Sequence, residues 1–211
     1  MPSKNEQDYL RCLYELQSKK GGGVRASDLA SSLGVSKPSV SEMVRKLTKG
    51  GLVENTPYGA IALTEKGVLE ARKVLRRHRL LEVFFSRVLG LKGTFHKEAH
   101  ESEHVLSEEA ERKLERLLKH PKKCPDGDEI PRRGAIVLPL SSAPDKRGLR
   151  VLFSTLEKDE LSRIKAMGVV HGEKATIIKK IHGGPLILEI KGSEVAIGKE
   201  VASRIYVEVG G

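Results

Sequence analysis

Three histidines and three glutamates stand within nine residues, from His96 to His104, in the segment HKEAHESEH. Successive residues of an α-helix are about 100° apart, so His96, His100 and Glu103 share one face and His104 lies at its edge. Ala99 lies on the same side, which indicates a partly buried face. An imidazole and a carboxylate buried without partners would be costly. A divalent cation would satisfy both.

A solvated, charge-rich helix is the alternative explanation of this segment. The histidines are nevertheless unevenly placed, since four of the seven fall between His78 and His104. His78 is followed four residues later by Glu82, which gives another pair on one helical face. Imidazole and carboxylate without thiolate suit iron(II), manganese(II), zinc or cobalt better than a soft metal.

The bulk composition predicts a globular protein with a basic surface. The 211 residues include 38 basic and 28 acidic side chains, a net charge of +10 that favours a polyanionic partner. The sequence has neither an apolar run long enough to span a membrane nor a secretory signal, which predicts a cytoplasmic protein without a membrane partner. Cys12 and Cys124 lack the spacing of a zinc knuckle or redox pair, and we expect one packed and one surface thiol.

The first fifty residues predict three helices. Apolar residues follow a helical period over Asp8–Gln17. Ser27 is expected to cap a short helix that ends at Leu33, and Ser36 to cap another that carries Pro38 in its first turn. The last of these helices also has an apolar stripe and ends at a glycine pair. The pattern is typical of a helix-turn-helix.

Two short apolar runs follow, Leu52-Val53 and Ala60–Leu63, with turn-forming residues over Asn55–Gly59 between them. A β-hairpin wing is therefore expected, and the whole would be a winged helix. Winged helices bind DNA or other proteins, and the basic and short polar side chains on the outer face of the second helix favour DNA. The candidate DNA-contacting residues are Arg25, Ser36, Lys37, Pro38, Ser39, Ser41, Glu42, Arg45 and Lys46.

The remaining chain predicts helices and then strands. A long helix is expected over 64–89, then the histidine helix, a helix capped by Ser107, and a linker over 120–134. Short β-like runs and one helix over 158–167 predict a small barrel at the end. The fold class is thus mainly α with a β C-terminal domain. We expect a winged helix-turn-helix over 1–64, a helical dimerisation and metal-binding domain over 65–131, and an SH3-like domain over 132–211.

Several segments together resemble the DtxR/MntR family of metal-dependent transcriptional repressors. They are SKPSVSEMVRKLTKGGLV, HRLLEVF, HKEAHESEHVLSEEAERKL and CPDGDEIP, with MGVVHGEKATI and GGPLILEIKGSEVAI similar to the FeoA-type, SH3-like domain of the longer members. The resemblance implies one metal site at Asp8, His100, Glu103 and His104. It implies a second at His78, Glu82 and His96, to which the third domain can add Glu157 and Glu160.

The chain departs from both branches of the family that it resembles. At His100 the iron type has cysteine and the manganese type glutamate, whereas at Asp8 the iron type has methionine and the manganese type aspartate. Arg11 stands where the manganese type has a glutamate. The donor set therefore favours iron(II) or manganese(II) as co-repressor, with zinc(II), cobalt(II) or nickel(II) as substitutes. Glu42 replaces a glutamine of one branch and can accept a hydrogen bond from cytosine N4.

The resulting hypothesis is a homodimeric repressor of metal-homeostasis genes that binds a palindromic double-stranded operator when metal is present. It is not expected to be an enzyme. A metallohydrolase is the main alternative, because histidine and glutamate clusters also build catalytic sites. A winged-helix regulator that answers a small organic ligand is another. Phosphoester or peptide turnover would indicate the first alternative, and a lack of transition-metal binding would indicate the second.

Overall fold

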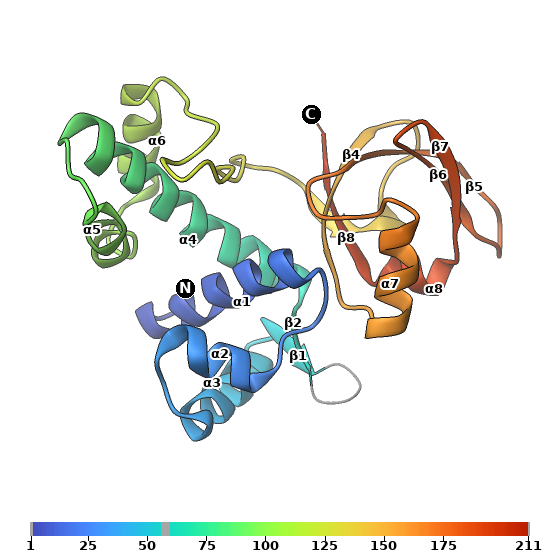
Figure 1. Ribbon diagram of the computed structural model, residues 1–211, viewed down its shortest axis with the longest axis horizontal. Coiled ribbons are helices and arrows are strands. Elements are labelled where there is room, and N and C mark those ends of the chain that lie inside the picture. Colours follow the sequence, from blue (N-terminus) through green and yellow to red (C-terminus); the bar gives the residue numbers. More distant parts are fainter. Residues whose placement is uncertain (1, 56–59, 211) are drawn as a thin grey trace. The chain divides into compact units, whose positions relative to one another are not determined.

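The structure is a computed structural model that describes residues 2–55 and 60–210 (Figure 1). The chain forms two compact units. The first unit comprises Met1–Arg11 and Leu69–Gly134, and the second comprises Cys12–Val68 and Ala135–Gly211. Helices α1 (Lys4–Lys20) and α4 (Glu65–Val83) contribute residues to both units.

The helix-turn-helix lies in the second unit. Ser36 caps its second helix as predicted, since its Oγ accepts a hydrogen bond from the backbone N–H of Ser39 at 3.2 Å. The prediction that Ser27 is a cap was wrong. The helix begins at Ala26, two residues earlier than predicted, and Asp28 instead accepts from the backbone N–H of Arg25 at 3.2 Å. The elements are α2 (Ala26–Leu33), α3 (Lys37–Lys49) and the antiparallel strands β1 (Val53–Asn55) and β2 (Ile61–Leu63).

The predicted hairpin is confirmed in its two strands, while residues 56–59 of the expected turn lie outside the described residues. Buried Val40, Val44 and Leu47 place one face of α3 on the core. The opposite face is exposed. This arrangement leaves the predicted DNA-contacting face of α3 in solvent.

The helices of the first unit follow the predicted order and differ from the prediction at their ends. The long helix continues from α4 into a π-helical turn, η2 (Phe84–Val88). The histidine helix α5 (Phe95–Ser102) ends before Glu103 and His104, which lie in the following turn, and α6 (Glu108–Leu117) begins at the predicted Ser107 cap. The segment over 120–134 is not a linker. Its Cys124 and Ile130 are buried against α4 because they complete an apolar cluster with Leu80 and Val83.

A buried ion-pair network joins α4 to α6. Arg76 Nε and Arg77 Nε lie 2.9 and 3.1 Å from the two carboxylate oxygens of Glu111, which is buried. Arg76 also pairs with Glu115, and Arg133 with Glu111. Removing one partner from a buried pair leaves an uncompensated charge, which typically costs about 3–5 kcal/mol. The network therefore holds the part of α4 that also carries His78 and Glu82.

The C-terminal residues form a curved antiparallel sheet with strand order β3-β8-β4-β5-β6-β7 (Figure 1). Its core contains Leu149, Ile177, Leu188 and Val207. The predicted fold class is confirmed, but the sequence pattern missed β3 and α8 because both are very short. The elements are β3 (Val137–Pro139), β4 (Gly148–Ser154), α7 (Lys158–Ala166), β5 (Lys174–Lys180), β6 (Leu186–Ile190), β7 (Ser193–Ile197), α8 (Lys199–Ser203) and β8 (Ile205–Val209).

An aromatic cluster lies within the second unit. The rings of Phe153 and Tyr206 stack with centroids 4.9 Å apart, and Tyr14 meets Phe153 edge-on at 5.9 Å. Burial raises the pKa of Tyr206 to about 12, and the carboxylates of Glu54 and Glu65 act in the same direction. The neutral phenol is therefore strongly favoured in the folded chain.

The raised pKa predicts an alkaline limit to stability. An unfolded tyrosine loses its proton near pH 10, so the contribution of Tyr206 is fully present below that pH and is lost between about pH 10 and 12, for a total of about 3 kcal/mol. Tyrosinate absorbance during a pH titration should include a late-titrating group from Tyr206. That group should disappear in Tyr206→Phe, which should also unfold at higher pH than the wild type. Identical titration curves for the two proteins would contradict the prediction.

Candidate metal centre

Four side chains converge in the first unit, and we call them the aspartate group: Asp8, His100, Glu103 and His104. Asp8 comes from α1, His100 from α5, and the other two from the turn after α5. One potential ligand atom from each lies within 4.8 Å of the others. His104 Nε2 is 3.0 Å from Asp8 Oδ1 and 3.4 Å from Glu103 Oε1. His100 Nδ1 is 3.3 Å from the same glutamate oxygen.

The donor atoms of the aspartate group fit a cation. His104 Nδ1 lies 2.9 Å from Gln7 Oε1, an acceptor, so Nδ1 carries the proton and Nε2 presents its lone pair. Asp8 Oδ1 and His104 Nε2 are buried, and neither makes a hydrogen bond within the part of the chain that the structure describes. Two buried acceptors 3.0 Å apart repel each other. A cation between them would turn this repulsion into ligation.

A second set of side chains, which we call the histidine group, comprises His78, Glu82 and His96. Glu82 Oε1 lies 2.9 Å from His78 Nε2 and 2.5 Å from His96 Nδ1. The two groups meet at Glu103. Its Oε2 lies 2.5 Å from His78 Nδ1, whereas its Oε1 faces the aspartate group. One fully buried carboxylate therefore contacts both groups.

The electrostatics keep the carboxylates of Glu82 and Glu103 charged. Burial alone would raise the pKa of Glu103, but its hydrogen bond with His78 and the nearby Arg11 charge outweigh burial and lower it. The pKa of Glu82 is lowered in the same way, chiefly by His78. Burial lowers the pKa of His104. Burial also acts to lower the pKa of His78, but hydrogen bonds with Glu103 and Glu82 prevail and raise it.

These opposite shifts predict different pH limits for the two groups. A metal binds neutral imidazole, so protons compete with it below the histidine pKa. The raised pKa of His78 brings this competition to higher pH in the histidine group, and the lowered pKa of His104 delays it in the aspartate group. Manganese(II) binding is measured between about pH 8 and 5 in two variants. Asp8→Asn removes a ligand of the aspartate group and so reports on the histidine group, whereas His96→Ala removes a ligand of the histidine group and so reports on the aspartate group. The midpoint for metal loss should be higher in Asp8→Asn. A reversed order would contradict the prediction.

A third potential ligand group was missed by the sequence interpretation. It comprises Glu82, Cys124 and Asp126, and so shares Glu82 with the histidine group. Asp126 Oδ2 lies 2.8 Å from His96 Nε2. The signal is the motif CPDGDEIP, which the sequence pattern assigns to a linker. Both cysteines are buried, so the expected surface thiol was also wrong, and burial raises the pKa of Cys124.

Glu157 and Glu160 belong to the second unit. Glu157 occupies the N-cap position of α7, and Glu160 Oε2 lies 2.8 Å from Arg204 Nη1. Among the residues that the structure describes, neither carboxylate is part of a candidate ligand group. Their ligation to metal stays a prediction.

The predicted DNA-contacting side chains are exposed, and some also stabilise the helix. Ser36 Oγ caps α3, and Ser41 Oγ donates to the carbonyl of Lys37 at 3.1 Å. The exposed residues are Arg25, Ser36, Lys37, Pro38, Ser39, Ser41, Glu42, Arg45 and Lys46. The structure thus leaves this set available to a partner, and DNA contact by each member stays a prediction.

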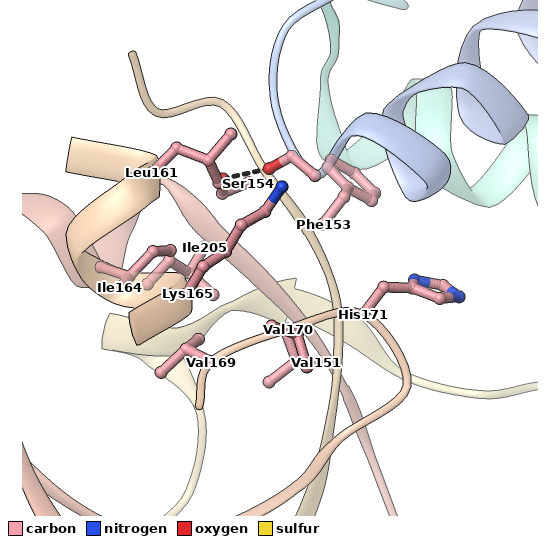
Figure 2. A pocket seen from close by; sticks show the side chains of 11 residues that line it. Val151, Phe153, Ser154, Leu161, Ile164, Lys165, Val169, Val170, His171 and Ile205 are labelled. Atoms are coloured by element: carbon pink, nitrogen blue, oxygen red, sulfur yellow. Dashed lines mark hydrogen bonds between the residues drawn. The ribbon is translucent and has the colours of Figure 1, made fainter. Parts of the chain in front are cut away.

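A small pocket in the second unit lies beside α7 and is lined largely by apolar side chains such as Leu161 and Ile164 (Figure 2). Its polar groups already have partners. Ser154 Oγ donates to the Gly21 carbonyl at 2.6 Å, and Lys165 Nζ donates to the Lys20 carbonyl at 2.8 Å. Figure 2 shows the first of these bonds as a dashed line. The pocket contributes to packing, and we assign no ligand to it.

The winged helix-turn-helix and the two groups of imidazole and carboxylate ligands together define a metal-responsive DNA-binding protein. Family models agree along the chain. The N-terminal DNA-binding domain of iron-dependent repressors matches residues 1–61, their metal-binding and dimerisation domain matches 64–132, and the FeoA domain matches 138–209. No described helix is both long and apolar enough to cross a membrane.

Relatives match over nearly the whole chain. The iron-dependent repressor IdeR of Mycobacterium tuberculosis is 32% identical over 95% of either chain, and the diphtheria toxin repressor of Corynebacterium glutamicum is 31% identical over 95% of this chain and 94% of its own. The solved manganese regulator SloR is 28% identical with a TM-score of 0.57 over 100% of both chains. The chain belongs to the diphtheria toxin repressor family, whose members are metal-dependent, DNA-binding transcriptional repressors.

Proposed function

We propose that this repressor is a homodimer that controls metal-homeostasis genes, with iron(II) or manganese(II) as co-repressor bound at the aspartate and histidine groups. The observation that carries the proposal is the buried pair of Asp8 Oδ1 and His104 Nε2, 3.0 Å apart and without hydrogen bonds among the described residues. Relatives named for iron and for manganese support either metal. Because it acts on DNA, we also propose that the protein is cytoplasmic.

The link from metal to DNA runs through α1. A bound cation supplies the positive charge that holds two carboxylates and two imidazoles together. Asp8 thereby ties α1 to the turn after α5, and α1 continues to Lys20 shortly before the helix-turn-helix. When Asp8 is held by the cation, α1 is held with it, and we expect the motion of the DNA-binding helices that follow α1 to be restricted. By linkage, DNA must then raise metal affinity by the same factor.

The domain boundaries at 1–64, 65–131 and 132–211 belong to the same proposal and are supported by the three family matches. A dimer would present two copies of α3 to the half-sites of a palindrome. Glu157 and Glu160 remain candidate ligands of the histidine group, as the family resemblance implies.

The test is fluorescence anisotropy under anaerobic conditions, with operator DNA selected from a random pool. Iron(II), manganese(II), cobalt(II) and zinc(II) are titrated separately at fixed salt, because DNA affinity depends steeply on ionic strength. At least one metal should raise specific affinity by about tenfold or more, within the usual range of allosteric coupling. Equal DNA affinity with metal and with chelator would refute the proposal.

A further inference from the structure

A positive side chain of the protein already lies among the donors of the aspartate group. Arg11 Nε lies 3.2 Å from Glu103 Oε1, and Arg11 Nη2 lies 3.1 Å from His100 Nδ1. The side chain of Arg11 is 16% exposed and that of Glu103 is fully buried. The guanidinium and the glutamate thus face each other where water screens them weakly.

Arg11 and a metal ion require the same atoms. A guanidinium only donates hydrogen bonds, so Arg11 pairs with the tautomer of His100 whose Nδ1 carries the lone pair, the same form that a metal ion binds. A divalent cation bound between His100 and Glu103 would need that lone pair and the same carboxylate oxygen, Oε1, which lies 3.3 Å from His100 Nδ1. The two positive charges would also repel each other.

We propose that Arg11 is a built-in competitor of the metal, which sets the metal affinity of the aspartate group. In the metal-free protein its guanidinium pairs with Glu103 and His100, and it must leave these atoms when the cation binds. This inference rests on the proposed function, since it takes the aspartate group to be a metal site. If Arg11 competes with the metal, the repressor binds metal only at a higher metal concentration than the four ligands of the aspartate group would require without Arg11.

The proposal predicts two changes of opposite sign. Replacing Arg11 by glutamine removes a charge that repels the metal, so manganese(II) affinity at the aspartate group should rise by about tenfold or more. The same change leaves buried Glu103 with one fewer positive neighbour, so the metal-free protein should unfold at a lower temperature. A purely structural role for Arg11 would weaken metal binding along with stability.

The experiment measures free manganese(II) by electron paramagnetic resonance during titration at fixed salt. All proteins carry His96→Ala, which disables the histidine group at a half-exposed side chain. The variants are Arg11→Gln, Arg11→Lys and, as a control for the loss of one positive charge, Arg112→Gln at an exposed position of α6. Thermal unfolding of each metal-free protein is measured in parallel.

Arg11→Gln should bind more tightly than the parent and Arg112→Gln equally. Arg11→Lys keeps the charge but lacks the second donor to His100, so its affinity should lie between those of the parent and Arg11→Gln. Unchanged or weaker binding by Arg11→Gln would overturn the proposal. Should Arg11→Gln fail to fold, an Arg11→Lys affinity equal to that of the parent would overturn it.

Asp8→Asn in the same background separates this proposal from the proposed function. If Asp8→Asn abolishes manganese(II) binding while Arg11→Gln binds as the parent does, the metal site stands and only the competitor role fails. If the parent binds no manganese(II), or Asp8→Asn binds as well as the parent, the assignment of the aspartate group itself is wrong.

Discussion

Glu103→Gln is expected to abolish the increase in operator affinity that metal produces, while the chain remains a dimer. The carboxylate is fully buried and contacts both ligand groups, with Oε1 near His100 and His104 and Oε2 at His78. The amide has nearly the same shape but no charge, and its nitrogen donates where a metal needs an acceptor. A coupling of about 5–150-fold between metal and DNA should therefore fall to about onefold.

Fluorescence anisotropy measures the operator affinity of the variant with and without manganese(II). Sedimentation measures whether the variant is still a dimer. Glu101→Gln is the matched control, because Glu101 is exposed near the end of α5, two residues before Glu103, and should keep the full metal response. If Glu103→Gln does not fold, Asp8→Asn tests the same link from α1. A tenfold metal response retained by a folded Glu103→Gln dimer would contradict the proposed mechanism.

Gly67→Ala is expected to destabilise the second unit by about 3 kcal/mol or more, or to prevent folding. A Cβ added at Gly67 would lie 1.9 Å from the Leu52 carbonyl oxygen and 3.1 Å from Leu63 Cδ2. That carbonyl is fixed, since it accepts a hydrogen bond from the backbone N–H of Thr64 at 3.1 Å. Alanine favours a helix over glycine by only about 1 kcal/mol. Overpacking against backbone outweighs that gain, because even side-chain overpacking typically costs about 1–3 kcal/mol.

Chemical denaturation of the two proteins measures the loss of unfolding free energy. Gly148→Ala is the control: a Cβ there meets no atom within 4 Å, and its effect should stay within about 0.5 kcal/mol. A Gly67→Ala protein as stable as the wild type would show that Leu52, just before β1, does not approach α4 as closely as described.

Several elements could be predicted from the sequence because local chemistry decides them. A hydroxyl at a helix start, a proline in the first turn and an apolar stripe are sufficient to predict α3 between Ser36 and Gly50. Short β-like runs separated by turn residues likewise located β6 and β8. The candidate ligands Asp8, His78 and His104 were reached through residue type and family resemblance, and the structure brings each into a ligand group.

Only the tertiary structure showed which distant side chains meet. Sequence periodicity reports the face of one helix, but it does not report what another helix places against that face. Glu103 was therefore assigned to the histidine helix rather than to the turn beyond it, and Cys124 to a linker rather than to a buried position beside Glu82. The pairing of Arg11 with Glu103 across more than ninety residues of chain was equally inaccessible, because packing of α1 against the turn after α5 creates it.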